Sequence, residues 1–223
     1  MPELLTKSLA DQSQELLQLR PVERIAWLFD QVPHDEILIT TSLGTTSALL
    51  LHMVHQVAPQ HPINYVDTGY LFPQTIAFGK KLAADWGLNL QRVTPDLASH
   101  AFTRREELFR RDADTCCAIN KVAPVNQLKE GKSVWLSGLL RFQNANRAQL
   151  GLFQKHGSLS KMYPILDMTE EEVALYQLLY ELPSHPLLDE GYASVGCTHC
   201  TQKGLGREGR WAGQKKTECG LHG

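Results

Sequence analysis

The chain has 223 residues, of which 43% are hydrophobic and 21% charged, and its formal net charge is −2. These values are typical of a soluble globular protein of one main domain, and the balanced charge argues against nucleic acid or a membrane surface as a partner. No run of about 18 apolar residues is present, so we expect no transmembrane helix. Residues 1–5 lack a signal-peptide pattern, which predicts a cytoplasmic protein whose cysteines are metal ligands or reactive thiols rather than disulfides.

The N-terminal segment, residues 3–32, carries leucines at helical spacing, and Pro21 suits the first position of a second helix. We expect a helical layer that packs on the domain or contacts a second copy in a homo-oligomer. We assign no chemistry to it.

A buried strand is predicted at residues 36–41, followed by a small hydroxylated turn at 42–47 and a helix through 48–54. Backbone N–H groups at a helix N-terminus bind anions, and Ser and Thr hydroxyls can add hydrogen bonds. The turn lacks the Gly-x-x-x-x-Gly-Lys pattern of a Walker loop, yet it predicts a phosphate site. The candidate contacts are Ser42, Gly44, Thr45 and Thr46.

A second strand at residues 63–66, a helix at 73–86 and a third strand at 88–93 follow. Strands alternating with helices predict βαβ units and a parallel sheet, in which ligands bind beyond the carboxyl ends of the strands. The second strand ends in three further candidates for substrate binding, Asp67, Thr68 and Gly69.

The remaining elements extend the same pattern. We expect an arginine-rich helix at residues 101–112 with a solvated face, strands at 134–138 and 161–165, and a helix that opens with a capping box at Thr169 and ends near Leu182. The fold class is α/β, a single-domain parallel twisted sheet with helices on both faces. Residues 1–196 form this domain, and residues 197–223 form a C-terminal segment with five basic and two acidic residues, which suits a bound anion.

Four of the five cysteines form two close pairs, Cys116 with Cys117 and Cys197 with Cys200. Four thiolates suit zinc or an iron–sulfur cluster. Adjacent cysteines are awkward ligands for one small tetrahedral ion, whereas a cluster offers separate iron atoms. The pattern therefore favours an iron–sulfur cluster, with zinc and non-ligating thiols as alternatives.

The fifth cysteine, Cys219, lies near the end of the sequence between Lys215 and Lys216 on one side and His222 on the other. Positive neighbours lower the pKa of a thiol and raise its thiolate fraction. These residues predict a mobile, nucleophilic thiol. The alternative is a cysteine without a role.

Together these motifs resemble the assimilatory adenylyl-sulfate reductases of the phosphoadenylyl-sulfate reductase family. The resemblance runs from about residue 36 to the C-terminus. The stretches that carry it are Asp67–Tyr70, Cys116-Cys117 with Lys121, Gly138–Arg147, His185–Leu187, Gly191-Tyr192, Cys197–Thr201, Arg207–Trp211 and Glu218–His222.

The resemblance implies an adenine-nucleotide α-hydrolase-like fold and thioredoxin-dependent reduction of adenylyl sulfate (APS) to sulfite and AMP. Cys219 would attack the sulfur, AMP would leave, and reduced thioredoxin or glutaredoxin would release sulfite from an S-sulfocysteine. A [4Fe-4S] cluster on the four paired cysteines is implied as a structural and electrostatic group, and that set favours APS over its 3′-phosphorylated form (PAPS). The additional candidate substrate contacts are Lys121, Arg141, Arg207, Arg210 and His222.

The chain also departs from the family pattern. Leu140 stands where an arginine is usual, Leu43 where phenylalanine is common, and Asn120, Ala123 and Met168 replace other common residues. Three rival readings remain: a PAPS reductase, an ATP-pyrophosphatase-type sulfurtransferase on the same scaffold, and a four-cysteine zinc module used for binding.

Overall fold

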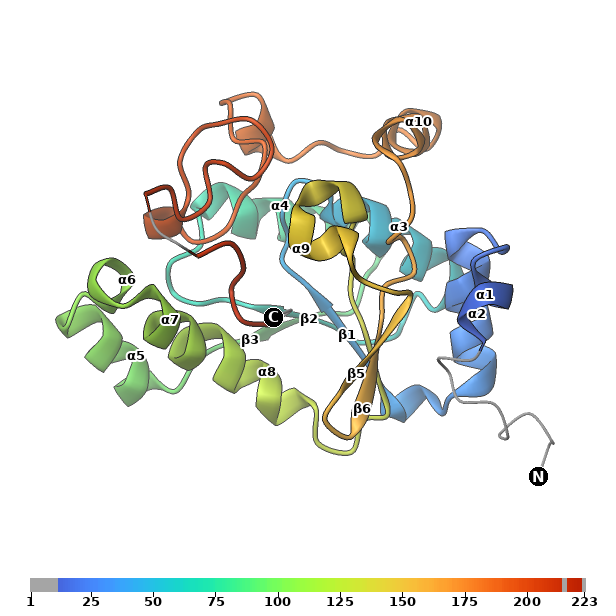
Figure 1. The fold of residues 1–223 in the computed structure, drawn as a ribbon, viewed down its shortest axis with the longest axis horizontal. Helices are drawn as coiled ribbons and strands as arrows, with labels where there is room; N and C mark the ends of the chain where they lie inside the picture. The colour runs from blue at the N-terminus through green and yellow to red at the C-terminus, as the bar shows by residue number, and fades with distance from the viewer. Residues whose placement is uncertain (1–11, 214–215, 222–223) are drawn as a thin grey trace.

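A computed structural model describes residues 12–213 and 216–221. Within them the chain is built around a six-stranded sheet with the order β3-β2-β1-β4-β6-β5 (Figure 1). The strands are β1 (Ile37–Thr41), β2 (Ile63–Val66), β3 (Leu90–Val93), β4 (Val134–Leu136), β5 (Phe153–His156) and β6 (Leu159–Met162). Neighbouring strands run parallel except in the antiparallel β5–β6 hairpin. The predicted α/β fold with a mainly parallel sheet is confirmed.

Helices cover both faces of the sheet (Figure 1). The longer ones are α2 (Pro21–Gln31), α3 (Ser47–Val57), α4 (Pro73–Trp86), α5 (Leu97–Arg105) and α10 (Glu170–Leu179). The shorter helices are α1 (Ser13–Leu16), η2 (His34–Glu36), α6 (Leu108–Arg111), α7 (Ala113–Cys117), the π-helix η3 (Ala118–Val122), α8 (Ala123–Leu128), η4 (Arg141–Gln143), α9 (Ala145–Ala148), η5 (Pro186–Leu188) and η6 (Thr198–Cys200).

The central strands explain why the sequence reads as continuous apolar runs. On β1, Ile37 and Ile39 pack into the core shared with α2, α3 and α4, whereas Leu38 packs with Trp135 of β4 and Val125 of α8 on the other face. Both faces of these strands are therefore buried, as expected for parallel strands covered by helices. Leu221, near the C-terminus, also packs on the α8 side of the sheet.

Three predicted elements differ from the structure. The strand expected at 161–165 is β6, which ends at Met162 and pairs with the unpredicted β5. Strand β5 is a partly exposed edge strand, so burial imposes little apolar pattern on it. The helix expected over 101–112 is divided into α5 and α6, because Glu107 takes a left-handed conformation (φ 48°). The strand expected at 134–138 ends at Leu136.

A buried arginine ties the N-terminal helices to the domain. Arg24 of α2 is 3% exposed and donates to the Leu16 carbonyl at 3.0 Å, the Pro164 carbonyl at 2.9 Å and the Asp167 carboxylate at 2.8 Å. This confirms a packing layer in the described part of the predicted 3–32 segment, and residues 3–11 lie outside the described residues. In the described ranges, no helix is both long and apolar enough to cross a membrane.

Candidate active site

The turn between β1 and α3 is fixed by its own backbone and by one close contact. Leu43 has φ 52°, a left-handed conformation that a branched side chain rarely adopts, and its side chain is fully buried. It packs against Gly79 of α4, where an added Cβ would lie 2.4 Å from Leu43 Cδ1. Thr45 Oγ1 also donates to the Ala193 carbonyl at 2.9 Å. The turn is therefore held from both α4 and the segment before the C-x-x-C motif.

A cavity opens beside this turn, at the carboxyl ends of β1 and β4. This is the point where the strand order reverses, the usual ligand position in a doubly wound sheet. The lining residues include Ser42, Gly44, Thr45, Thr46, Lys121, Ser137, Gly138, Arg147, Val195, Arg207, Arg210, Trp211, Glu218 and Cys219. The predicted phosphate turn, Lys121, two tail-proximal arginines and Cys219 therefore share one cavity.

The cavity wall is rich in donors that lack partners. Arg207 Nε, Arg210 Nε, Trp211 Nε1 and Ser137 Oγ are buried and make no hydrogen bond within the described structure. Buried polar groups are nearly always paired in folded proteins, so such a group of donors indicates a site for an acceptor. Because two of these donors belong to guanidinium groups and Lys121 is beside them, the acceptor that fits best is an anion with several oxygens.

The environment of Cys219 favours its thiolate form. Burial disfavours the charge, but the Lys121 ammonium and a backbone N–H from Leu221 outweigh it, so the pKa of Cys219 is lowered. The thiol in turn helps to raise the pKa of Lys121, although burial opposes that shift. A nucleophile needs this pairing of a thiolate with a fixed cation.

The other four cysteines line a second, smaller pocket on the far side of Lys121. Burial raises the pKa of Cys116 to about 11 and that of Cys117 to about 12. Cys197 Sγ lies 3.2 Å from the Thr68 hydroxyl, and the Asn120 amide is 3.6 Å from Cys116 Sγ. The two predicted pairs thus meet at one place, brought together by α7 and η6.

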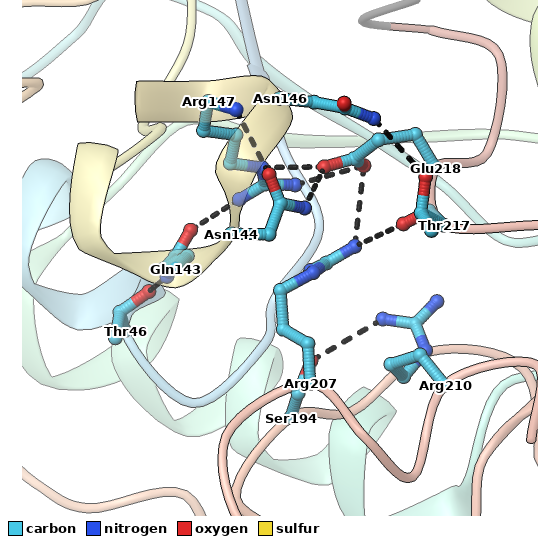
Figure 2. Close-up of polar contacts among 10 residues, drawn as sticks. All are labelled: Thr46, Gln143, Asn144, Asn146, Arg147, Ser194, Arg207, Arg210, Thr217 and Glu218. Atoms are coloured by element: carbon cyan, nitrogen blue, oxygen red, sulfur yellow. Dashed lines mark hydrogen bonds and ion pairs between the residues drawn. The ribbon is translucent and has the colours of Figure 1, made fainter. Parts of the chain in front are cut away.

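Glu218, next to Cys219, is bound by side chains from a different part of the chain (Figure 2). Arg147 donates to both of its carboxylate oxygens, at 2.6 and 3.0 Å, and Arg207 donates at 3.2 Å. Asn144 adds a bond of 2.8 Å. Burial opposes ionisation, but the Arg147 guanidinium outweighs it, and the pKa of Glu218 falls to about 2.

Residues 36–203 match the phosphoadenosine phosphosulfate reductase domain. Over 210 residues, the chain is 36% identical to the adenosine 5′-phosphosulfate reductase of Mesorhizobium japonicum, which covers 92% of this chain and 83% of that protein. The chain belongs to the phosphoadenosine phosphosulfate reductase family. It is therefore an oxidoreductase.

Other phosphoadenosine phosphosulfate reductases also match over most of this chain. The phosphoadenosine 5′-phosphosulfate reductase of Xanthomonas oryzae pv. oryzae is 37% identical over 219 residues, or 93% of this chain and 90% of that protein. The crystal structure of the Candida auris phosphoadenylyl-sulfate reductase superposes with a TM-score of 0.74 at 23% identity, over 88% of this chain and 98% of that one. This structural likeness shows the shared fold.

Some predicted substrate contacts of this family member lie away from the cavity. Asp67 is buried and accepts from Arg92 Nε at 2.9 Å and from the backbone N–H of Gly69 at 3.0 Å, while Thr68 belongs to the cysteine pocket. Arg141 donates to the Leu150 carbonyl at 3.2 Å. The cavity is not lined by Asp67, Thr68, Gly69 or Arg141, so the role of these four residues in substrate binding stays a prediction. His222 lies outside the described residues.

Arg147 and Glu218 were not predicted as site residues, although both lie in stretches that carry the resemblance to this reductase family. Their pairing across 71 positions could not be read from spacing. Leu140, which replaces a common arginine, is fully buried in the main core and supplies no cation to the cavity. Asn120 is likewise buried and donates to the Cys116 carbonyl at 3.0 Å.

Proposed function

We propose that this protein reduces APS to sulfite and AMP, with Cys219 as the nucleophile. The observation that carries the proposal is one cavity that holds a thiol of lowered pKa, Lys121 and the buried unpaired donors of Arg207 and Arg210. A phosphosulfate anhydride presents anionic oxygens to such donors and an electrophilic sulfur to such a thiol. The names of the relatives support this class of substrate.

In the first step, the Cys219 thiolate attacks the sulfur of the sulfonyl group, and the bond from that sulfur to the bridging oxygen breaks. AMP leaves with the bond electrons, and an S-sulfocysteine forms. Arg207 and Arg210 neutralise the anionic oxygens, while the hydroxyls of the β1–α3 turn and the N-terminal N–H groups of α3 hold the phosphate. Lys121 keeps Cys219 ionised until the attack.

In the second step, a thiolate of a reduced dithiol protein attacks Cys219 Sγ, sulfite leaves with the electron pair of the S–S bond, and a mixed disulfide forms. The second thiol of the reductant then releases Cys219 and becomes oxidised in a disulfide. Thioredoxin or glutaredoxin has this chemistry, and both operate in the reducing cytoplasm. The described tail around Cys219, residues 217–221, must leave the cavity for this step, because Cys219 lines that cavity.

We assign a [4Fe-4S] cluster to Cys116, Cys117, Cys197 and Cys200. The donor set fits, because these four thiols line one pocket and suit iron. Within the described residues, however, no group of three or more His, Cys, Asp and Glu side chains is arranged to hold a metal ion, and the assignment rests on the pocket and the donors. A bound cluster would cross-link α7 and the η6 segment, and because its four thiolate ligands give it a net negative charge, the Lys121 ammonium beside the pocket would offset that charge. The thiols already provide the two electrons of the reaction.

A sulfite-release assay tests the proposed function. We expect reduced thioredoxin to support sulfite release from APS, a strong preference for APS over PAPS, and no turnover by Cys219→Ser. Preference for PAPS would establish the alternative substrate, which the Xanthomonas relative's name makes the second candidate. Consumption of ATP with release of pyrophosphate, and no sulfite from either nucleotide, would instead place the protein among the ATP-pyrophosphatase-type sulfurtransferases.

A further inference from the structure

The C-terminal tail, residues 216–221, is held on both sides of Cys219. Before the cysteine, Glu218 is bound by Asn144, Arg147 and Arg207, which we call the tail anchor (Figure 2). After it, the Leu221 carbonyl accepts a bond of 2.6 Å from Lys161, a residue only 1% exposed. Cys219 therefore lies one residue after one fixed point, Glu218, and two residues before the other, Leu221.

The tail anchor is built to hold a carboxylate. The side chains of Arg147 and Glu218 are only 10% and 9% exposed, and their contact is bidentate. Asn144 caps α9 by accepting from the Arg147 N–H at 2.8 Å and donates its amide to Glu218, so one residue orients both partners. Arg147 is also hydrogen-bonded to Gln143. A buried, bidentate and fully satisfied pair has a defined geometry, unlike an exposed ion pair.

We propose that Glu218 is a positioning residue, and that its contacts with the tail anchor aim Cys219 into the cavity. The catalytic part of this statement rests on the proposed function. The docking part depends only on the contacts of Glu218.

Docking of the tail leaves room for a ligand. Glu218 and Cys219 both line the cavity, in company with Arg210 and Lys121, so the docked tail forms part of the wall instead of filling the space. The docked arrangement is therefore the one from which the thiol attacks.

The arginines of the wall divide between tail and ligand. The guanidinium group of Arg147 donates hydrogen bonds to Glu218 and Gln143. Among the described residues, the Arg210 side chain has no carboxylate partner. It donates hydrogen bonds to Ser194 Oγ and the Val195 carbonyl, and its Nε is unpaired. Arg207 can bind both the tail and a ligand, because its Nη2 donates to Glu218 while its Nε is unpaired. We expect Arg210 to bind the anionic substrate and Arg147 to bind the tail.

The test compares Glu218→Gln and Arg147→Gln with Arg210→Gln in the full chain. Loss of the Glu218 charge alone would favour the Cys219 thiolate and speed the attack, because this carboxylate opposes ionisation of the thiol. Loss of positioning predicts the opposite: kcat falls roughly 10- to 100-fold with no rise in KM. Arg147→Gln should lower kcat as well, whereas Arg210→Gln should mainly raise KM.

The matched control is Asn146→Ala. Asn146 neighbours Arg147 on α9 and also contacts the tail, through an exposed bond of 3.1 Å to Thr217. We expect its kcat and KM to stay within about twofold of wild type, as is usual for an exposed contact. The double variant of Glu218 and Arg147 should be no slower than the slower single variant, because the pair acts as a unit.

A second readout does not depend on the substrate. Iodoacetamide alkylation of Cys219, followed by peptide mass spectrometry at a pH where the rate no longer changes, should be several-fold faster in Glu218→Gln than in Asn146→Ala or wild type. Equal alkylation rates together with an unchanged kcat would overturn the proposal, as would fully additive losses in the double variant. If wild type released no sulfite, the proposed function would fail, and alkylation would still test docking.

Discussion

At the scale of single residues, burial and charge divide the cysteines into different chemical states. Burial raises the pKa of Cys116, Cys117 and Cys200, which keeps free thiols protonated and unreactive unless a metal group displaces the proton. Cys219 is partly buried, and desolvation also acts to raise its pKa, but the nearby Lys121 ammonium reverses the shift. Lys121, which lines both pockets, therefore favours the thiolate of Cys219, whereas the cysteines of the smaller pocket remain candidate metal ligands.

Replacing Lys121 by Met should move the acid limb of the pH–rate profile. The pKa of Cys219 is lowered in the wild type, so the thiolate persists as the pH falls below the usual thiol range. Without the ammonium, the pKa of Cys219 should rise, so the rate falls at neutral pH but recovers in alkali. Single-turnover formation of S-sulfocysteine against pH measures this. An unshifted acid limb, with the visible absorbance of the protein preserved, would contradict the role of Lys121.

Some site residues were predictable from sequence and others were not. The β1–α3 turn was predictable, because a strand, a small hydroxylated turn and a helix are local signals. The choice between Arg141 and Arg147 was not, because it depends on where α9 directs each side chain. Arg141 contacts the Leu150 carbonyl, whereas Arg147 enters the cavity wall.

At the scale of elements, the β1–α3 turn depends on a helix that supplies no polar contact to the cavity. Gly79 of α4 leaves the space that Leu43 fills, and Leu43 holds the left-handed residue of the turn. The helix thereby supports the turn, with its Ser42 and Gly44, from behind.

Gly79→Ala tests this support, because helix propensity and overpacking predict changes of opposite sign in the free energy of unfolding. Helix propensity alone predicts stabilisation by roughly 1 kcal/mol in a helix interior. The contact with Leu43 predicts a loss of about 1–3 kcal/mol, because an added methyl overpacks a filled core. The free energy of urea unfolding decides between them. Addition of Leu43→Ala should relieve the overpacking, so additive losses in the double variant would argue against a direct contact.

Two strands that pack in the core, β1 and β2, were predicted well from the sequence. β1 and β2 have apolar patterns imposed by the core and were placed within a residue. The edge strand β5 was missed because it is only partly buried, and the break between α5 and α6 was missed because it depends on the backbone of Glu107 rather than on a glycine or proline.

At the scale of the whole molecule, the sheet supplies a rigid floor, and the C-terminal segment supplies the rest of the site. This segment passes from the cysteine pocket through Arg207 and Arg210 to Cys219, and Figure 1 shows it above the carboxyl ends of the central strands. The backbone bridges Leu71–Cys197 and Thr201–Arg210 join it to the β2 side and to itself. Bringing these parts together is tertiary packing, which a linear pattern does not reveal.

Loss of the metal group should therefore affect the segment more than the sheet. We expect Cys200→Ser to lose visible absorbance and sulfite release while its far-ultraviolet circular dichroism stays close to wild type. The reason is that η6 lies outside the sheet and its core. A colourless wild-type protein with stoichiometric zinc would contradict the cluster assignment.

The most direct measurement for the central claim traps the enzyme between its two half-reactions. Full-length protein is reduced, freed of reductant, mixed with APS, quenched and digested, and the sulfonate adduct is located by peptide mass spectrometry. We expect one adduct, on the peptide containing Cys219, and we expect reduced thioredoxin to remove it with release of sulfite. An adduct on a peptide containing any other cysteine, or AMP release without an adduct, would contradict it.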